Sequence, residues 1–434
     1  MNDYLGLMSN KRVKNAWAFY DWANSVYSLV ISTAVFPIYF NSVAEERIEF
    51  LSMDLESASL YSYSLAFSFL IVAIISPILS GVADYSGNKK TFMQIFAWMG
   101  SLACMSLFFF DESNVYYGLS MSVVASVGFW GSLVFYNAYL PEIAKPEEQD
   151  GLSAKGFSLG YIGSSLLLIL NLVMISVPET FGFSGAGEAT RFSFLLVGLW
   201  WIGFAHVTFL RLPNNIHQRK PKEKGWIWRG FRELKSVAIQ VNEQQNLRKY
   251  LYSFFFFSVG VQTVILLASL FGDKELGLDS SKLIATILII QFVGIGGAQL
   301  FSYLSKKYGN LQSLKISIII WTLICIFAYF LSKTDPWVEY KFFAIGGLVG
   351  LVMGGIQSIG RSTYSKLLPK TESSASFFSF YDVTEKIAII CGTFVYGYLI
   401  QLTGDMRASA LSLSLFFLIG FLQLLRIKKG KKVY

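Results

Sequence analysis

The loop Ser80-Gly-Val-Ala-Asp84-Tyr-Ser-Gly87-Asn88 recurs later in the chain as Ser302-Tyr-Leu-Ser-Lys306-Lys-Tyr-Gly309-Asn310. The serine and the glycine of the first copy each lie 222 positions before their counterparts in the second (302 minus 80, and 309 minus 87). The charged residue and the asparagine are separated by the same number of positions. That offset is about half of the 434-residue chain. An internal repeat of this length predicts two structurally similar halves.

Each copy of the loop follows an apolar stretch that is long enough to cross a bilayer, and twelve such stretches fill the chain from Trp17 to Ile427. With 54% apolar and 15% charged residues, the composition excludes an ordinary soluble domain. The predicted fold class is an all-α membrane protein whose twelve transmembrane helices form two parallel six-helix repeats, as in secondary transporters. We predict spans near residues 17–40, 58–83, 92–110, 115–143, 157–177, 192–212, 247–271, 283–304, 313–331, 341–368, 376–402 and 408–427.

A polar interruption divides the spans into two groups of six. It predicts a cytoplasmic central loop at 213–246 between an N-terminal six-helix bundle at 1–212 and a C-terminal bundle at 247–434. With both termini in the cytoplasm, roughly 28 of the 36 lysines and arginines fall on the inner side and about 7 on the outer side. This bias predicts the orientation, and it explains the net charge of +8 without a nucleic-acid partner.

The second part of the central loop has the pattern of an amphipathic helix. Residues 214–224 are polar and basic and predict a linker, whereas apolar residues recur at helical spacing from 225 onward. The basic residues Arg229, Arg232 and Lys235 lie largely off the apolar stripe. A helix on the inner leaflet and an ordinary connector packed on the bundle both fit this pattern.

Charged residues inside predicted spans are the first candidates for a functional site, because charge in hydrocarbon is costly and is kept where it pairs or works. Asp382 and Lys386 are four residues apart with the acid first, which predicts an ion pair within one helix. In a purely structural interpretation, Asp21 or Glu385 pairs with Arg361 to hold helices together. In a functional one, three acids face two bases, so one carboxyl lacks a basic partner and can carry protons. Glu385 is the expected unpaired carboxyl.

Uncharged polar residues in the spans extend the list of candidates for substrate or ion binding. Because spans one, four, seven and ten would line a central cavity, we include Asn24, Asn137, Gln262 and Gln357. Such amides also form hydrogen bonds between helices purely for packing. In the repeated loop, Ser80, Asp84 and Gly87 are candidates for a gating role.

No residue pattern predicts a metal site, a cofactor or catalysis. The histidines, His206 and His217, are not clustered with other ligands, and the three cysteines lie far apart within spans. A hydrolase would need a nucleophile with a partnered base, and no such arrangement is recognisable. The sequence therefore predicts that the chain is not an enzyme.

Two levels of resemblance to known families follow from these motifs. The pattern Ser80-x-x-x-Asp84-x-x-Gly87-x-Lys89 resembles the signature between helices two and three of the major facilitator superfamily. A second set of motifs is more specific: Tyr20-Asp21-Trp22-Ala23-Asn24-Ser25, Asn137-Ala-Tyr-Leu-Pro141, Gly160-Tyr161, Gly260-Val-Gln-Thr263 with Glu275-Leu-Gly-Leu278, Gly354-Gly-Ile-Gln357-x-x-x-Arg361-Ser362, and Phe380-Tyr-Asp382 with Lys386. Together these motifs resemble the vacuole-effluxer-like branch of that superfamily, named for fungal vacuolar amino-acid exporters linked to autophagy.

The resemblance implies a secondary active transporter that moves a small solute, such as an amino acid or related metabolite, by alternating access. A carrier of a sugar, amphiphile or lipid, and a non-transporting membrane receptor, remain the alternatives. The expected partners are the small-molecule solute, protons as a candidate coupling ion, and the lipid bilayer, with no nucleic acid. Short loops and the lack of an organellar extension favour a bacterial inner-membrane protein over a vacuolar one. We also expect a monomer, with both termini cytoplasmic as the charge bias predicts.

Overall fold

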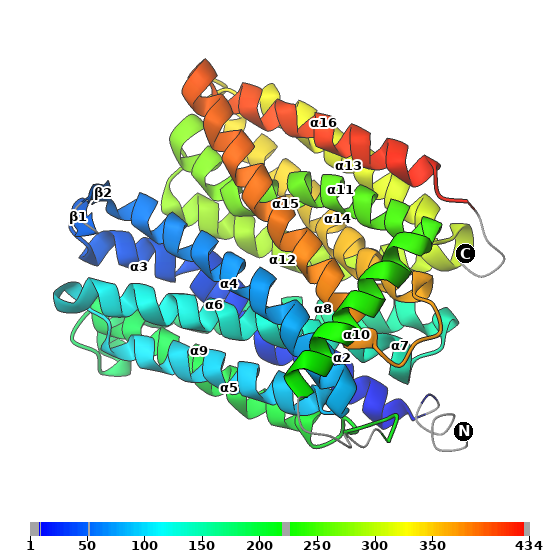
Figure 1. Cartoon of the computed structure of the whole chain (residues 1–434). Helices are drawn as coiled ribbons and strands as arrows, with labels where there is room; N and C mark the ends of the chain where they lie inside the picture. Colours follow the sequence, from blue (N-terminus) through cyan, green and yellow to red (C-terminus); the bar gives the residue numbers. More distant parts are fainter. Residues whose placement is uncertain (1–7, 9, 51–52, 219–225, 429–434) are drawn as a thin grey trace. The chain divides into compact units, whose positions relative to one another are not determined.

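The computed structural model describes residue 8 and residues 10–50, 53–218 and 226–428, and most of them are helical (Figure 1). Twelve helices among these described residues are long and apolar enough to cross a membrane, which confirms the predicted fold class. In the first half of the sequence the main helices are α2 (Lys11–Val26), α3 (Phe36–Val43), α4 (Ser57–Ser86), α5 (Lys89–Ser106), α6 (Val115–Ala138), α7 (Leu140–Ile143), α8 (Pro146–Ser176) and α9 (Ala186–Phe209). After α10 (Trp226–Glu243) come α11 (Gln245–Leu270), α12 (Ser280–Tyr308), α13 (Asn310–Tyr329), α14 (Val338–Leu367), α15 (Ser374–Thr403) and α16 (Met406–Leu425).

Both copies of the repeated loop are tight connections between two helices. Helix α4 ends at Gly87, which has the left-handed φ of 75°, and α5 begins at Lys89. Helix α12 ends at Gly309, also with a positive φ of 86°, and α13 begins at Asn310. A residue with a Cβ is strained at these φ values, so the glycine in each copy is explained by the backbone.

Three local features differ from the predicted spans. The first span contains a π-helical segment, Tyr27–Ala34, before α3, whose Pro37 cannot donate a backbone hydrogen bond. A short antiparallel hairpin, β1 (Arg47–Phe50) with β2 (Met53–Glu56), lies between the first two spans. Helix α8 begins at Pro146 rather than near residue 157, because proline and two glutamates suit a first helical turn.

The amphipathic segment of the central loop forms a helix, α10, as predicted. Its described side chains include the exposed Trp228 and Ile239. The predicted linker at 214–224 lies partly outside the described residues, since 219–225 are not described. The structure therefore confirms the helix and leaves its position at a membrane surface as a prediction.

The described residues form two compact units, which we treat separately. The N-unit comprises Asn10–Asn137 and Leu159–Phe231, and the C-unit has its described residues within Met1–Ser9, Ala138–Ser158 and Arg232–Tyr434. Ala138–Ser158 thus packs with helices from the second half of the sequence. Division of the chain into bundles at 1–212 and 247–434 stays a prediction.

Close helix packing in the C-unit depends on small residues where α12 crosses α14. A Cβ atom added at Gly350 of α14 would lie 2.5 Å from the Ile290 carbonyl oxygen of α12. A Cβ atom added at Gly347, one turn earlier on the same helix, would have no neighbour within 4 Å. Two glycines of α14 therefore face very different surroundings.

We expect Gly350→Leu to lower the free energy of unfolding by about 1–3 kcal/mol, because the side chain would force α12 and α14 apart. The measurement is thermal unfolding of the purified protein in lipid nanodiscs. Gly347→Leu is the matched control and should change the unfolding temperature little. An equal decrease of the unfolding temperature in both variants would contradict the packing explanation.

Candidate functional site

A cluster of charged side chains on α15 combines two acids with one base. The Lys386 side chain is completely buried, and its Nζ atom lies 3.0 Å from Asp382 Oδ1 and 3.4 Å from Glu385 Oε2. Gln262 on α11 donates from Nε2 to Glu385 Oε1 over 2.8 Å. The predicted ion pair between Asp382 and Lys386 is confirmed, and α11 joins the same group through Gln262.

The prediction that Glu385 lacks a basic partner is wrong. Neighbouring residues of a helix point about 100° apart, but the four-carbon stem of Lys386 lets its ammonium group reach both carboxylates. The unsatisfied oxygen is instead Asp382 Oδ2, which is buried and accepts no hydrogen bond from the described residues. In the ion pairs of this cluster, two carboxylates face one ammonium group, and Asp382 Oδ2 is the carboxylate oxygen that accepts no hydrogen bond from a described residue.

Arg361 of α14 is buried, with 3% of its surface exposed, against the first turns of α8. Its guanidinium group donates to the Ser153 hydroxyl over 2.9 Å and to the Ser153 carbonyl over 3.1 Å. The same group lies 4.3 Å from the centre of the Phe157 ring, a cation–π distance. The predicted burial of Arg361 is confirmed, and its pairing with Asp21 or Glu385 stays a prediction.

Asp21 lies in the interior of the N-unit, with 4% of its surface exposed. The Tyr136 hydroxyl donates to Asp21 Oδ2 over 2.8 Å. Trp17 stacks on the Tyr136 ring at 4.5 Å and donates to the Tyr136 carbonyl over 2.8 Å. Asn24, one further turn along α2, is 1% exposed, and its Nδ2 donates to no described residue. Helical spacing thus places Trp17, Asp21 and Asn24 on one interior face.

The remaining candidates are buried to different degrees. Asn137 and Gln357 are half-buried, whereas Ser80 and Asp84 are almost completely buried at the end of α4. The Gly87 carbonyl accepts a hydrogen bond from the Asn215 backbone N–H over 3.0 Å. The first copy of the loop is therefore pinned to the segment that follows α9.

One buried network was not predicted from the sequence. Asp150 on α8 forms an ion pair with Lys366 of α14, with 2.7 Å between Oδ2 and Nζ and side chains only 3% and 4% exposed. Asp150 also accepts from the Ser305 hydroxyl and from Asn310 Nδ2, each over 2.8 Å. Lys366 donates in addition to Asn310 Oδ1 over 2.9 Å. Ser305 and Asn310 belong to the second copy of the repeated loop.

The sequence contained one signal for this network, the repeat itself. Asp150 lies in Pro146-Glu-Glu-Gln-Asp150, a charged run that resembles an exposed loop, and Lys366 lies near a predicted helix end. Asn310, however, matches Asn88 of the first copy, and a polar residue repeated at the same place can indicate a shared structural role. Asp150 was missed because the start of α8 was placed too late.

Twelve spans among the described residues and an internal repeat are typical of a secondary transporter. The profile of the family described as "Vacuole effluxer Atg22 like" matches residues 9–433, so the chain belongs to that family. It is 32% identical over 412 residues to YxiO, an MFS-type transporter of Bacillus subtilis (strain 168), covering 94% of this chain and 92% of the relative. It is 25% identical over 488 residues to Autophagy-related protein 22-1 of Penicillium rubens, covering 91% and 80%.

Solved structures support the same fold. The human organic anion transporter MFSD10 superposes with a TM-score of 0.73 at 12% identity, covering 96% of this chain and 99% of the other. A bacterial homologue of the iron transporter ferroportin, in an outward-facing state, gives 0.67 at 14% identity over 96% and 98%. The proton:xylose symporter XylE gives 0.68 at 13% identity over 100% and 98%. At these identities the likeness concerns the fold alone.

We expect Lys366→Met to lower the free energy of unfolding by about 3–5 kcal/mol, because Asp150 would remain buried without its cation. Adding Asp150→Asn to that variant should restore much of the loss, since no buried charge would then remain. The measurement is thermal unfolding in nanodiscs. Arg47 and Asp54 form the control pair, with side chains 57% and 62% exposed, so Arg47→Met should change stability by less than about 1 kcal/mol. A double variant no more stable than Lys366→Met would refute this account.

Proposed function

We propose that this transporter moves an amino acid or a closely related metabolite that carries both an ammonium and a carboxylate group. The observation that carries the proposal is the α15 cluster, in which acceptor and donor groups lie side by side. Asp382 Oδ2 has no described donor, so a substrate ammonium would supply the missing interaction. Lys386 and the Gln262 amide are the nearby donors that suit a substrate carboxylate.

Partial exposure of the cluster supports a binding role over a purely structural one. The Glu385 side chain is 17% exposed, whereas Asp382 is 7% and Lys386 is 0% exposed. A solute that arrives at Glu385 would therefore reach the deeper charges without entering a sealed core. The vacuole-effluxer family of the chain supports export as the direction of transport.

In the proposed cycle, two six-helix bundles, 1–212 and 247–434, rock around a midplane site while 213–246 connects them. Asp21, Asn24, Asn137, Gln357 and Arg361 are the further residues we assign to that site. The protein would act as a monomer in the bacterial inner membrane with both termini cytoplasmic. In this scheme Ser80, Asp84 and Gly87 gate the cytoplasmic side.

Solute exchange in proteoliposomes tests the proposed substrate class. The reconstituted protein should exchange labelled amino acids and not labelled sugars, and Asp382→Asn and Lys386→Met should each reduce exchange at least tenfold by removing a charged contact. Asp335→Asn, in an outer loop, is the matched control and should keep full exchange. Binding of amino acids without flux would indicate a receptor instead.

We assign proton coupling to the cluster of Asp382, Glu385 and Lys386 on α15. Because two carboxylates face one ammonium group, a single proton would neutralise the cluster. We expect Glu385→Gln to retain exchange but to lose accumulation driven by a pH gradient, and Glu339→Gln, in a half-exposed ion pair with Lys282, to retain both. Full gradient-driven accumulation in Glu385→Gln would remove Glu385 from the coupling mechanism.

The orientation is tested by labelling from outside the cell. In a cysteine-free background, single cysteines at the exposed positions Glu46 and Lys333 should react with an impermeant thiol reagent in intact cells. A cysteine at Lys307, also exposed, should react only after the membrane is permeabilised. The reverse pattern would place the termini outside.

A further inference from the structure

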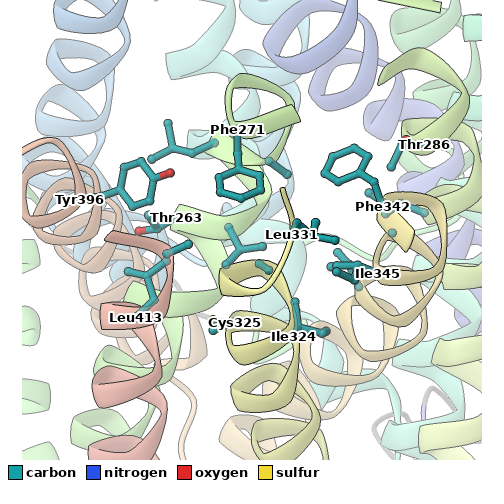
Figure 2. A pocket seen from close by; sticks show the side chains of 18 residues that line it. Thr263, Phe271, Thr286, Ile324, Cys325, Leu331, Phe342, Ile345, Tyr396 and Leu413 are labelled. Carbon is teal, nitrogen blue, oxygen red and sulfur yellow. The ribbon is translucent and has the colours of Figure 1, made fainter. Parts of the chain in front are cut away.

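Two apolar surfaces lie outside the charged clusters described above. One lines a space within the C-unit, where Phe271, Leu331 and Phe342 gather (Figure 2). None of its lining residues is charged, so it offers no strong selection between neutral ligands. The other surface is on α10, where apolar and basic side chains lie together. Of the two, the α10 surface is the one whose chemistry specifies a partner.

One face of α10 packs against other helices. Gly230 lies so close to α4 that a Cβ atom added to it would be 2.8 Å from the Val82 backbone nitrogen. Val237, two turns later, is 0% exposed, and the Glu233 carboxylate between them accepts a hydrogen bond from the Ser373 hydroxyl. Positions 230, 233 and 237 follow the i, i+3, i+7 spacing of a single helix face. The opposite face of α10 is therefore the outward one.

The outward face of α10 combines large apolar side chains with basic ones. Trp228 is 74% exposed and Ile239 is 50% exposed, and Phe231 is exposed beside them. Arg232 and Lys235 are exposed on the same face, because positions 228, 232, 235 and 239 follow helical spacing. Neither basic side chain forms an ion pair with a described residue. This face thus presents apolar surface together with positive charge that has no described counterion.

The position of α10 on α4 indicates what the outward face meets. Exposed side chains form one stripe along α4, at Tyr63, Phe67, Leu70 and Ile74. Because α4 is long and apolar enough to cross a membrane, this stripe faces the bilayer. Gly81 is about five turns after Tyr63 on the same stripe, and it is the residue of α4 on which the Gly230 carbonyl packs. Helix α10 therefore covers the end of a lipid-facing stripe, and its outward face is directed at the same lipid.

The depth of this crossing matches the boundary between acyl chains and headgroups. Gly81 is five residues before Ser86, the last residue of α4, which is about 8 Å along the helix axis. Amphipathic helices lie in the boundary layer of a bilayer with their apolar side chains among the upper acyl carbons. Tryptophan is enriched there, and basic side chains are attracted to anionic headgroups.

We propose that the outward face of α10 binds anionic phospholipids of the adjacent leaflet, which is the inner leaflet in the proposed orientation. Trp228, Phe231 and Ile239 lie among the upper acyl carbons, and Arg232 and Lys235 contact the phosphate groups. An acidic soluble protein would match the charge but not the position, because the face is directed at lipid.

A fluorescent probe on the full-length protein tests the proposal in nanodiscs of defined lipid. Ser236 is exposed at the edge of the outward face, so Ser236→Cys in a cysteine-free background can carry an environment-sensitive NBD label. As phosphatidylglycerol replaces phosphatidylcholine, NBD emission should shift to the blue, and quenching by a spin label near the headgroups should rise and saturate. Added salt should reverse both changes, because it screens the attraction. These titrations leave the five proposed contact residues unchanged, so a misfolded variant cannot decide the result.

Two pairs of substitutions separate binding by α10 from a general effect of charge. Arg232→Gln with Lys235→Gln should raise the phosphatidylglycerol fraction at half-maximal quenching about threefold or more, because each basic side chain near an anionic surface strengthens binding by about fivefold. Lys306→Gln with Lys307→Gln removes the same charge from the exposed end of α12 and should leave that fraction unchanged. An equal increase in both pairs would overturn the proposal.

The apolar contact is tested by Trp228→Gln, which should lower quenching at every lipid composition. Trp337→Gln is the matched control, since Trp337 is 63% exposed at the start of α14, and it should leave quenching unchanged. A probe signal that is the same in neutral and anionic discs overturns the proposal. So does a signal that follows the number of protein copies in each disc, which would indicate a second copy of the chain on this face. Transport is not used as a readout, so these results are independent of the substrate proposed above.

Discussion

The cost of removing charge from water organises the interior of this protein. Two groups of ion pairs have little or no exposed surface, namely Asp150 with Lys366, and Asp382 and Glu385 with Lys386. They lie in helices that are long and apolar enough to cross a membrane. A charge in this environment is tolerated only beside a partner, so a pair between two helices requires those helices to be neighbours. The Asp150 network joins α8, α12, α13 and α14, and the Gln262 contact adds α11 to α15.

The sequence was sufficient for the features that depend on hydrophobicity and spacing alone. Three features follow from local sequence patterns. The twelve spans follow from the length of the apolar stretches, the helix in the central loop from apolar residues at helical spacing, and the Asp382–Lys386 pair from a separation of four residues. The repeat predicted two similar halves, and each copy of its loop is a tight connection that contains a glycine with positive φ.

The sequence was insufficient where the outcome depends on how far a side chain reaches or on contacts distant in the chain. Lys386 neutralises two acids at once, and counting charges cannot show which carboxylate oxygen stays open. The partner of Asp150 lies 216 residues away, so a charged run at the start of α8 resembled an exposed loop. The hairpin after the first span was missed because its two strands are only four residues each, too short for a pattern.

The two copies of the repeated loop also show how a duplicated element diverges. In the first copy the acid is internal, since Asp84 belongs to the motif and is 2% exposed. In the second copy the equivalent position is the exposed Lys306, and a carboxylate from elsewhere in the chain, Asp150, accepts hydrogen bonds from Ser305 and Asn310 of that loop. Each copy of the loop is therefore associated with a buried carboxylate, which belongs to the loop itself in the first copy (Asp84) and to the start of α8 in the second (Asp150).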